Sequence, residues 1–316
     1  MTPPQEHIAN LSASHGPDFP SASRLAYSIG GLTFALAAEG SLRLALDREL
    51  LPFSADEAAI PGFACDVALQ VAWADSLQVP FSTPLFHSGG LWSLFAEPTG
   101  YRFSFLSPLL GSTPYKEARL DSEFRSGRVL LSRRYFDTAA PVYPLEYPLD
   151  ELLMIHRLSR GDGLEVHAVG LTDESGRGHL FLGHSGAGKS TTARLWRNRP
   201  GAKILSDDRI ILRALAGRIV MFGTPWHGDA GIASPESAPL SAIYLLDHGT
   251  SNERVPLSPA SAAAELFART FVTHHSEDGI RCTLDFLDRI TRDIPCYLFR
   301  FVPDASAVEA ICRADA

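Results

Sequence analysis

Cysteine and lysine are both scarce in this chain of 316 residues. The four cysteines, Cys65, Cys282, Cys296 and Cys312, include no C-x-x-C pair and no group with histidine at zinc-site spacing. This argues against a disulfide framework and a zinc site, and free thiols in a reducing compartment are expected. Only three lysines stand among 28 basic residues, so a lysine at a motif position is informative.

Long apolar runs and an excess of positive charge are also missing. No run approaches the roughly 20 apolar residues that a membrane-spanning helix needs, and the N-terminus lacks the basic stretch and apolar core of a secretory signal. The net charge of -8 is spread over both halves of the chain, which argues against nucleic-acid binding. We expect a cytoplasmic protein with neither a membrane nor a nucleic-acid partner.

The chain divides into three parts by composition. Residues 1–22 are rich in proline and are expected to form a disordered arm. Residues 23–140 are predicted to form a β-rich N-terminal domain, in which short apolar segments alternate with glycine-containing turns. The predicted strands lie in 27–39, 66–74, 91–97, 101–107 and 127–136. A proline-spaced stretch with Pro141, Pro144 and Pro148 marks the domain boundary.

Residues 146–316 have the pattern of an α/β domain. After a short helix predicted at 149–159, strands are predicted at 164–171, 179–182, 203–205, 209–212 and 242–246. Helices are predicted at 191–198 and 260–271. The strand at 179–182 runs directly into a glycine-rich loop that is followed by a helix, which is the order of an α/β phosphate-binding core.

That loop is the strongest functional signal. Residues 183–190 read GHSGAGKS and match G-x-x-x-x-G-K-[ST] at every fixed position. Glycines let successive backbone N–H groups turn toward phosphates, and the next helix directs its positive dipole end at the same anion. Lys189 is predicted to reach the β- and γ-phosphates and Ser190 to bind Mg²⁺. The residues predicted to bind ATP are Gly183, His184, Ser185, Gly186, Ala187, Gly188, Lys189, Ser190 and Thr191.

Carboxylates that could serve such a site occur in two places. Asp207 and Asp208 follow a strand, so that one could hold Mg²⁺ and the other accept a proton from the attacking hydroxyl. Asp247, at the end of the strand 242–246, is a second candidate for the metal. A polar turn is the structural alternative for the pair. Arg209 and Arg213 are further candidates for positive charge.

Three segments together resemble the catalytic domain of HPr kinase/phosphorylase, a P-loop family related to phosphoenolpyruvate carboxykinase. They are His167-Ala168 on a strand, GHSGAGKS, and Ser206-Asp207-Asp208, in the order and near the spacing of the family. The resemblance covers about 146–316. It implies that Asp207 is the catalytic base, that Asp208 helps to hold Mg²⁺, and that His167 lies near the reacting phosphate, beside Lys189.

The resemblance also implies a reaction. The expected activity is transfer of the γ-phosphoryl group of ATP to a hydroxyl, with a serine of a peptide or protein as the acceptor, as in the related lasso-peptide precursor kinases. Phosphorolysis is not expected, because the Glu-Ile-Arg-Gly-Leu-Gly signature of the family is replaced by 223–229, GTPWHGD, a candidate acceptor or phosphate loop. The alternatives are a small-molecule kinase or carboxykinase-like enzyme, and an ATP-binding regulator. The N-terminal domain could recognise the substrate, and a homo-oligomer is possible, as in the family.

Overall fold

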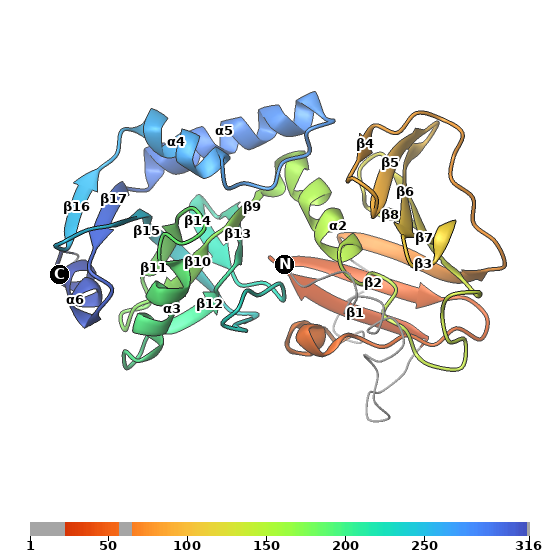
Figure 1. Ribbon diagram of the computed structural model, residues 1–316, viewed down its shortest axis with the longest axis horizontal. Coiled ribbons are helices and arrows are strands. Elements are labelled where there is room, and N and C mark those ends of the chain that lie inside the picture. The colour runs from red at the N-terminus through yellow and green to blue at the C-terminus, as the bar shows by residue number, and fades with distance from the viewer. Residues whose placement is uncertain (1–22, 57–64, 315–316) are drawn as a thin grey trace. The chain divides into compact units, whose positions relative to one another are not determined.

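The computed structural model describes residues 23–56 and 65–314, so the arm expected at 1–22 lies outside them. The described residues form two compact units (Figure 1). The first contains 23–28 and Leu32–Arg157, and the second contains Ile29–Gly31 and the chain from Leu158 onward. This division follows Arg157, whereas the sequence-based one falls at 140–146. No helix among the described residues is both long and apolar enough to cross a membrane.

The first unit is built on an eight-stranded mixed sheet in the order β1-β2-β3-β8-β7-β6-β5-β4. Pairing is parallel from β2 through β3 to β8, and antiparallel from β8 through to β4. The strands are β1 (Arg24–Ile29), β2 (Leu32–Ala38), β3 (Val67–Ala74), β4 (Phe86–His87), β5 (Trp92–Glu97), β6 (Gly100–Ser107), β7 (Gly111–Asp121) and β8 (Ser126–Ser132).

The side-chain period of two explains these strands. In β3, Val67, Leu69 and Val71 are buried, whereas Ala68 and Gln70 between them are exposed. Each of the five segments predicted as strands overlaps at least one strand, and β4 and β7 are strands that the prediction omitted.

Helix α2 (Leu149–Arg157) is the last element of the first unit. It has the acidic first turn and basic last turn that suit a helix dipole. The helix predicted at 149–159 is confirmed as an α-helix to Arg157, and its last two residues lie in a π-helical turn, Leu158–Asp162. The chain leaves helical geometry in the following turn, where Gly161 has φ of 96°.

The second unit contains nine strands in one branched mixed sheet. Its main path is β12-β10-β11-β15-β14-β13-β9, and β17 pairs with both β15 and β16. The strands are β9 (Leu164–His167), β10 (Val169–Thr172), β11 (Gly178–Leu182), β12 (Lys203–Ser206), β13 (Arg209–Leu215), β14 (Arg218–Phe222), β15 (Ser237–His248), β16 (Glu253–Pro256) and β17 (Cys296–Phe301).

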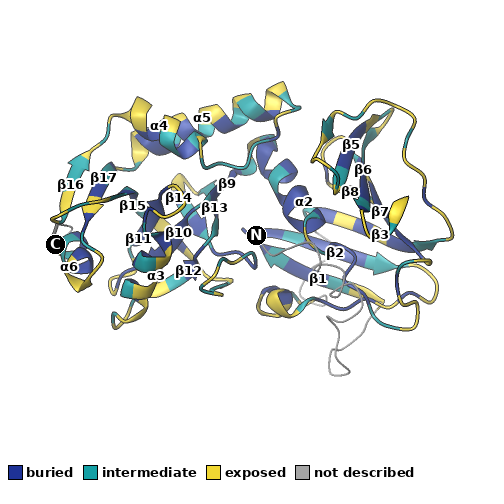
Figure 2. Cartoon of the chain, viewed as in Figure 1, coloured by how far each residue is buried: buried dark blue, intermediate teal, exposed yellow. Residues whose placement is uncertain are grey.

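Helices cover both faces of this sheet. Apolar residues of α3 (Lys189–Arg197) and α6 (Ala305–Ala314) share one hydrophobic cluster, which includes Trp196 and Ile311. Those of α4 (Pro259–Phe267) and α5 (Glu277–Asp293) share the other, which includes Leu266 and Ile290. Figure 2 shows the buried strands of this unit and the exposed outer side of α5. The protein therefore has an α/β architecture with mixed sheets, and the α/β class is the part that the sequence predicted.

One predicted helix ends early, and this shapes the site. The helix predicted at 260–271 is α4, which ends at Phe267. The next residues lie antiparallel to β9, because His167 N donates to Arg269 O at 2.8 Å and Phe271 N donates to Glu165 O at 2.9 Å. Pairing with a strand thus replaces the last helical turn.

Two bends of the chain lie side by side, one between β9 and β10 and the other between β12 and β13. β9 passes into β10 at Ala168, and β12 passes into β13 at Asp207 and Asp208. Ala168 N donates to Asp208 O at 3.0 Å, which joins the two bends. His167 is in register with Arg209 on β13. The bends therefore bring His167 and both aspartates to one place in the sheet.

Candidate phosphate-binding site

The glycine-rich loop joins β11 to α3, in the strand-loop-helix order that the sequence predicted. Gly186 has φ of 84° and Gly188 has φ of 105°, values that favour glycine. Space limits the residue type as well, because a Cβ on Gly188 would lie 2.5 Å from the ring of Phe301, and one on Gly183 would lie 2.7 Å from Cβ of Ala187. The backbone shape of the loop therefore depends on its glycines.

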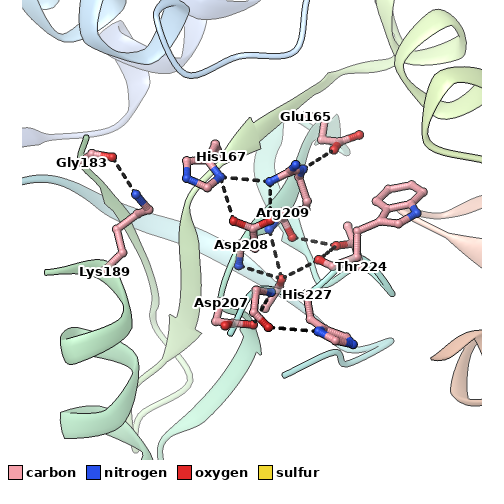
Figure 3. Close-up of polar contacts among 12 residues, drawn as sticks. Glu165, His167, Gly183, Lys189, Asp207, Asp208, Arg209, Thr224 and His227 are labelled. Carbon is pink, nitrogen blue, oxygen red and sulfur yellow. Dashed lines mark hydrogen bonds and ion pairs between the residues drawn. The ribbon is translucent and has the colours of Figure 1, made fainter. Parts of the chain in front are cut away.

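Hydrogen bonds within the loop and from β15 hold this shape. Ala187 N donates to His184 O at 3.1 Å. His248, the last residue of β15, lies with Nε2 3.0 Å from Gly186 O and donates to that carbonyl. Lys189 Nζ donates to Gly183 O at 2.8 Å and to His184 O at 3.4 Å, so its ammonium lies over the loop (Figure 3).

The charge of Lys189 interacts with two groups from other elements. Burial lowers the pKa of Lys189, the carboxylate of Asp208 raises it and the guanidinium of Arg269 lowers it, with a net decrease. Asp208 and Arg269 therefore both lie within electrostatic reach of the ammonium that the sequence assigns to nucleotide phosphates.

Asp208 and His167 form a hydrogen-bonded pair beside the loop. Asp208 Oδ1 lies 2.9 Å from His167 Nδ1, and Asp208 Oδ2 accepts a hydrogen bond from Arg209. Arg209 Nη1 also lies 3.0 Å from His167 Nδ1. We assign the Nδ1 proton to His167, because the Asp208 carboxylate is the stronger acceptor.

The pKa of Asp208 reflects these neighbours. Burial raises it, but the hydrogen bond from His167 and the charges of Arg209 and Lys189 outweigh burial and bring it below its ordinary value. Asp208 therefore remains a carboxylate at neutral pH and can act as an oxygen ligand for a hard cation.

Arg209 is held in place by its own set of contacts. Its Nε lies 3.6 Å from Oε1 of the buried Glu165, and its guanidinium lies 4.4 Å from the ring centre of Phe271. The sequence predicted positive charge from Arg209, and the structure places that charge against two carboxylates. Arg213 instead donates to the backbone oxygens of Asp162 and Gly30, each at 2.9 Å.

Asp207 lies in a different environment from Asp208. It is 4% exposed, and its carboxylate accepts three backbone hydrogen bonds, from Gly228 N at 3.1 Å, Ala230 N at 2.9 Å and Ile232 N at 3.2 Å. The segment 228–232 thus wraps around Asp207. The resemblance implies a catalytic base here, whereas the contacts are those of a carboxylate that anchors a loop.

The anchored loop continues the segment 223–229 that the sequence singled out. Thr224 is fully buried, and its hydroxyl donates to Arg209 O at 2.8 Å. His227 and Asp229 are exposed. The loop therefore has a fixed base and polar exposed residues at its tip.

The remaining predicted binding residues lie where the loop meets α3. His184, Ser185 and Ser190 are exposed, while Thr191 is half-buried and accepts a hydrogen bond from Arg194 at 3.2 Å. Asp247, the second metal candidate, accepts from His248 N at 2.9 Å and lies 4.0 Å from Arg300 Nε.

The donor set can be compared with what Mg²⁺ and a nucleotide require. No group of three His, Cys, Asp or Glu side chains in the described part of the chain could hold a metal by itself. Mg²⁺ in nucleotide sites typically takes one or two protein oxygens and completes its shell with phosphates and water. The hydroxyl of Ser190 and the carboxylate of Asp208 fit that pattern, and the loop glycines fit an approaching phosphate.

Four residues of this neighbourhood were missed from the sequence: Glu165, His248, Arg269 and Phe271. None belongs to a motif, and each reaches the site through strand pairing or the early end of α4. For Glu165 the sequence does carry a signal: it is two residues before His167 on a predicted strand, so the two side chains lie on the same face.

Comparisons with known proteins add little. No family model and no curated protein matches the chain. Among solved structures, one match is the HPr(Ser) kinase/phosphatase from Coxiella burnetii, with 13% identity over 48% of this chain and 95% of that chain. Its TM-score of 0.29 is too low to establish a shared fold or function.

Proposed function

We propose that the chain is a phosphotransferase that binds ATP with Mg²⁺ through Gly183–Ser190. One observation carries the proposal: a loop with two glycines at positive φ lies between a strand and a helix, with the ammonium of Lys189 over it and Asp208 within electrostatic reach. This arrangement combines backbone donors, one cation and one carboxylate, the combination that P-loop enzymes use on nucleotide phosphates.

Each residue then has a defined task. Bound ATP supplies the phosphoryl group, and Mg²⁺ reduces its negative charge. The N–H groups of the loop and Lys189 would bind the phosphates, and the Ser190 hydroxyl and Asp208 carboxylate would hold the metal. His167 donates a hydrogen bond from Nδ1–H to Asp208 and thereby fixes the orientation of that carboxylate.

The acceptor is a hydroxyl that must lose a proton as the phosphoryl group arrives. The resemblance to HPr kinase/phosphorylase favours a serine of a peptide or protein, with Asp207 as the base. For that role Asp207 would have to exchange one of its three backbone hydrogen bonds for the hydroxyl. The exposed His227 and Asp229 on the loop anchored by Asp207 are the residues we assign to acceptor contact.

Calorimetry with ATP and Mg²⁺, followed by incubation with γ-labelled ATP and candidate acceptors, tests the proposal. Lys189→Met should lower ATP affinity by at least about tenfold, because it removes a charge-assisted contact to phosphate. Lys203→Met is the matched control, because Lys203 is exposed and forms an ion pair with Glu236. Absence of ATP binding by the unaltered chain would refute the proposal.

The labelled product separates the remaining alternatives. A labelled serine in a peptide or protein supports the proposed acceptor, and a labelled metabolite identifies a small-molecule kinase. ATP that binds tightly but is not consumed with any acceptor would overturn the enzymatic assignment in favour of a nucleotide-binding regulator.

A further inference from the structure

Arg269 lies directly across from His167 in the second unit. His167 N donates to Arg269 O, Phe271 N donates to Glu165 O, and Val166 is bridged to Thr270 in the antiparallel sense. In this arrangement Arg269 is the cross-strand neighbour of His167, with both side chains on the same face.

Phe271 contacts a second arginine near His167. Arg269 lies in the turn that ends α4, and Phe271 lies two residues further on, opposite Glu165. The ring of Phe271 contacts the guanidinium of Arg209, which pairs with Asp208. Arg209 is in register with His167 on its other side. His167 therefore lies between two arginines.

The two arginines differ in how completely their charge is compensated. Arg209 lies against Asp208 and the buried Glu165. Arg269 Nη1 donates to the backbone oxygen of Glu265 at 2.7 Å and to its carboxylate at 2.6 Å, and that carboxylate belongs to a side chain that is 41% exposed. Within the described residues, Nε of Arg269 is buried and has no hydrogen-bond acceptor.

A second cation near Lys189 therefore needs an explanation. The positive charge of Arg269 contributes to lowering the pKa of Lys189. The carboxylate of Asp208 offsets this repulsion at Lys189, and a second anion near the loop could pair with Arg269 as well. A polyphosphate bound on the loop would supply that anion.

We propose that Arg269 binds the terminal phosphate of the nucleotide, together with Lys189 and next to His167. The inference rests on the proposed function and adds a specific task, which is to distinguish ATP from ADP. The guanidinium has five N–H donors in a planar fork, which suits a terminal phosphate with three oxygens.

The test compares the binding of ATP and ADP, each with Mg²⁺, by calorimetry on the full chain. Arg269→Gln should lower ATP affinity by about tenfold or more and change ADP affinity far less, so that the preference for ATP over ADP shrinks. Arg269→Lys keeps the positive charge but loses the planar guanidinium donors, so its loss of ATP affinity should be smaller than that of Arg269→Gln. If Arg269→Gln does not fold, Arg269→Lys is measured in its place.

Glu265→Gln is the matched control. It breaks the same Glu265–Arg269 pair but leaves the cation in place, so ATP affinity should be retained or increased. If Arg269 served only to hold the end of α4, Arg269→Gln and Glu265→Gln would lower the melting temperature and the ATP affinity by similar amounts. The inference would then be wrong.

The outcomes also separate this inference from the proposed function. If the unaltered chain binds no ATP, the proposed function fails and the inference fails with it. If the unaltered chain binds ATP and Arg269→Gln leaves the ratio of ATP to ADP affinity unchanged, only the role of Arg269 is overturned.

Discussion

Replacement of Asp207 by Asn distinguishes a carboxylate that anchors a loop from one that accepts a proton. Oδ1 of Asp207 accepts from Gly228 N and Ile232 N, and Oδ2 accepts from Ala230 N. Asn has nearly the same shape but only one oxygen. The two bonds to Oδ1 can persist in weaker form, whereas the N–H of Ala230 would then meet an N–H₂ group, which is also a donor.

The expected cost follows from this count. A hydrogen bond to a charged group contributes about 1.5–3 kcal/mol, and a buried donor left without an acceptor adds to the loss. One bond lost and two weakened amount to about 2–4 kcal/mol of the free energy of unfolding of the second unit. Asp207 is 4% exposed, so solvent offers little compensation.

Urea denaturation and amide hydrogen exchange measure the effect. We expect Asp207→Asn to lower the free energy of unfolding and to increase exchange at Gly228, Ala230 and Ile232. Asp208→Asn, the neighbouring control, should leave exchange at these amides unchanged, because Asp208 makes none of the three bonds. The anchoring role is refuted if Asp207→Asn keeps normal stability and exchange, binds ATP with Mg²⁺, and no longer transfers phosphate; Asp207 would then be the base.

Three further predictions concern the loop, the metal and the first unit. Gly188→Ala should lower the free energy of unfolding by about 1–3 kcal/mol and weaken ATP binding, because the new side chain meets both a positive φ and a steric clash. Gly217→Ala is the control in thermal melts: Gly217 also has a positive φ but lies in open space, so this change should lower stability less. Asp208→Asn should lower the affinity for ATP with Mg²⁺ by about tenfold or more in calorimetry, and Asp247→Asn should change that affinity little. If Asp247→Asn had the larger effect, Asp247 would be the metal ligand instead of Asp208. Burial, with two neighbouring glutamates, raises the pKa of Asp47 from 3.8 to about 7. Its folded state therefore holds a proton that the unfolded state loses, so stability should fall as pH rises from about 4 to about 7, and Asp47→Asn should flatten this dependence in urea titrations.

The phosphate loop could be predicted because its requirements are local. Positive φ at Gly186 and Gly188 follows from the residue type, and the loop residues are contiguous in the chain. The same holds for α2 and α3, whose apolar spacing and flanking residues identify them without knowledge of the rest of the chain.

The parts that were missed depend on residues far apart in sequence. Strand β7 contains Lys116 and Glu117, both buried, which hides the apolar pattern of a strand. The ammonium of Lys116 is compensated by Glu146, 30 residues later, at 3.2 Å from Oε1. Local propensity cannot reveal such a pair, because either residue alone predicts an exposed position.

The end of α4 was misplaced for a related reason. Alanine-rich 260–268 favours a helix, and nothing in the sequence of 269–271 forbids one more turn. The helix stops because Arg269 and Phe271 make backbone hydrogen bonds to β9, about 100 residues earlier in the chain. This long-range pairing places Arg269 beside His167.

For the choice of metal ligand between Asp208 and Asp247, the order of strands in the sheet and the neighbouring charges point to different residues. Strand β15 is the parallel neighbour of β11, with Leu245 opposite Leu182, so Asp247 lies just beyond the start of the phosphate loop. Asp208 follows β12, which is separated from β11 by β10. Strand order alone would therefore favour Asp247. Yet the ammonium of Lys189 interacts with Asp208, and Asp247 faces Arg300. Because a metal ligand must share the phosphates with Lys189, the charges favour Asp208 as the proposed metal ligand.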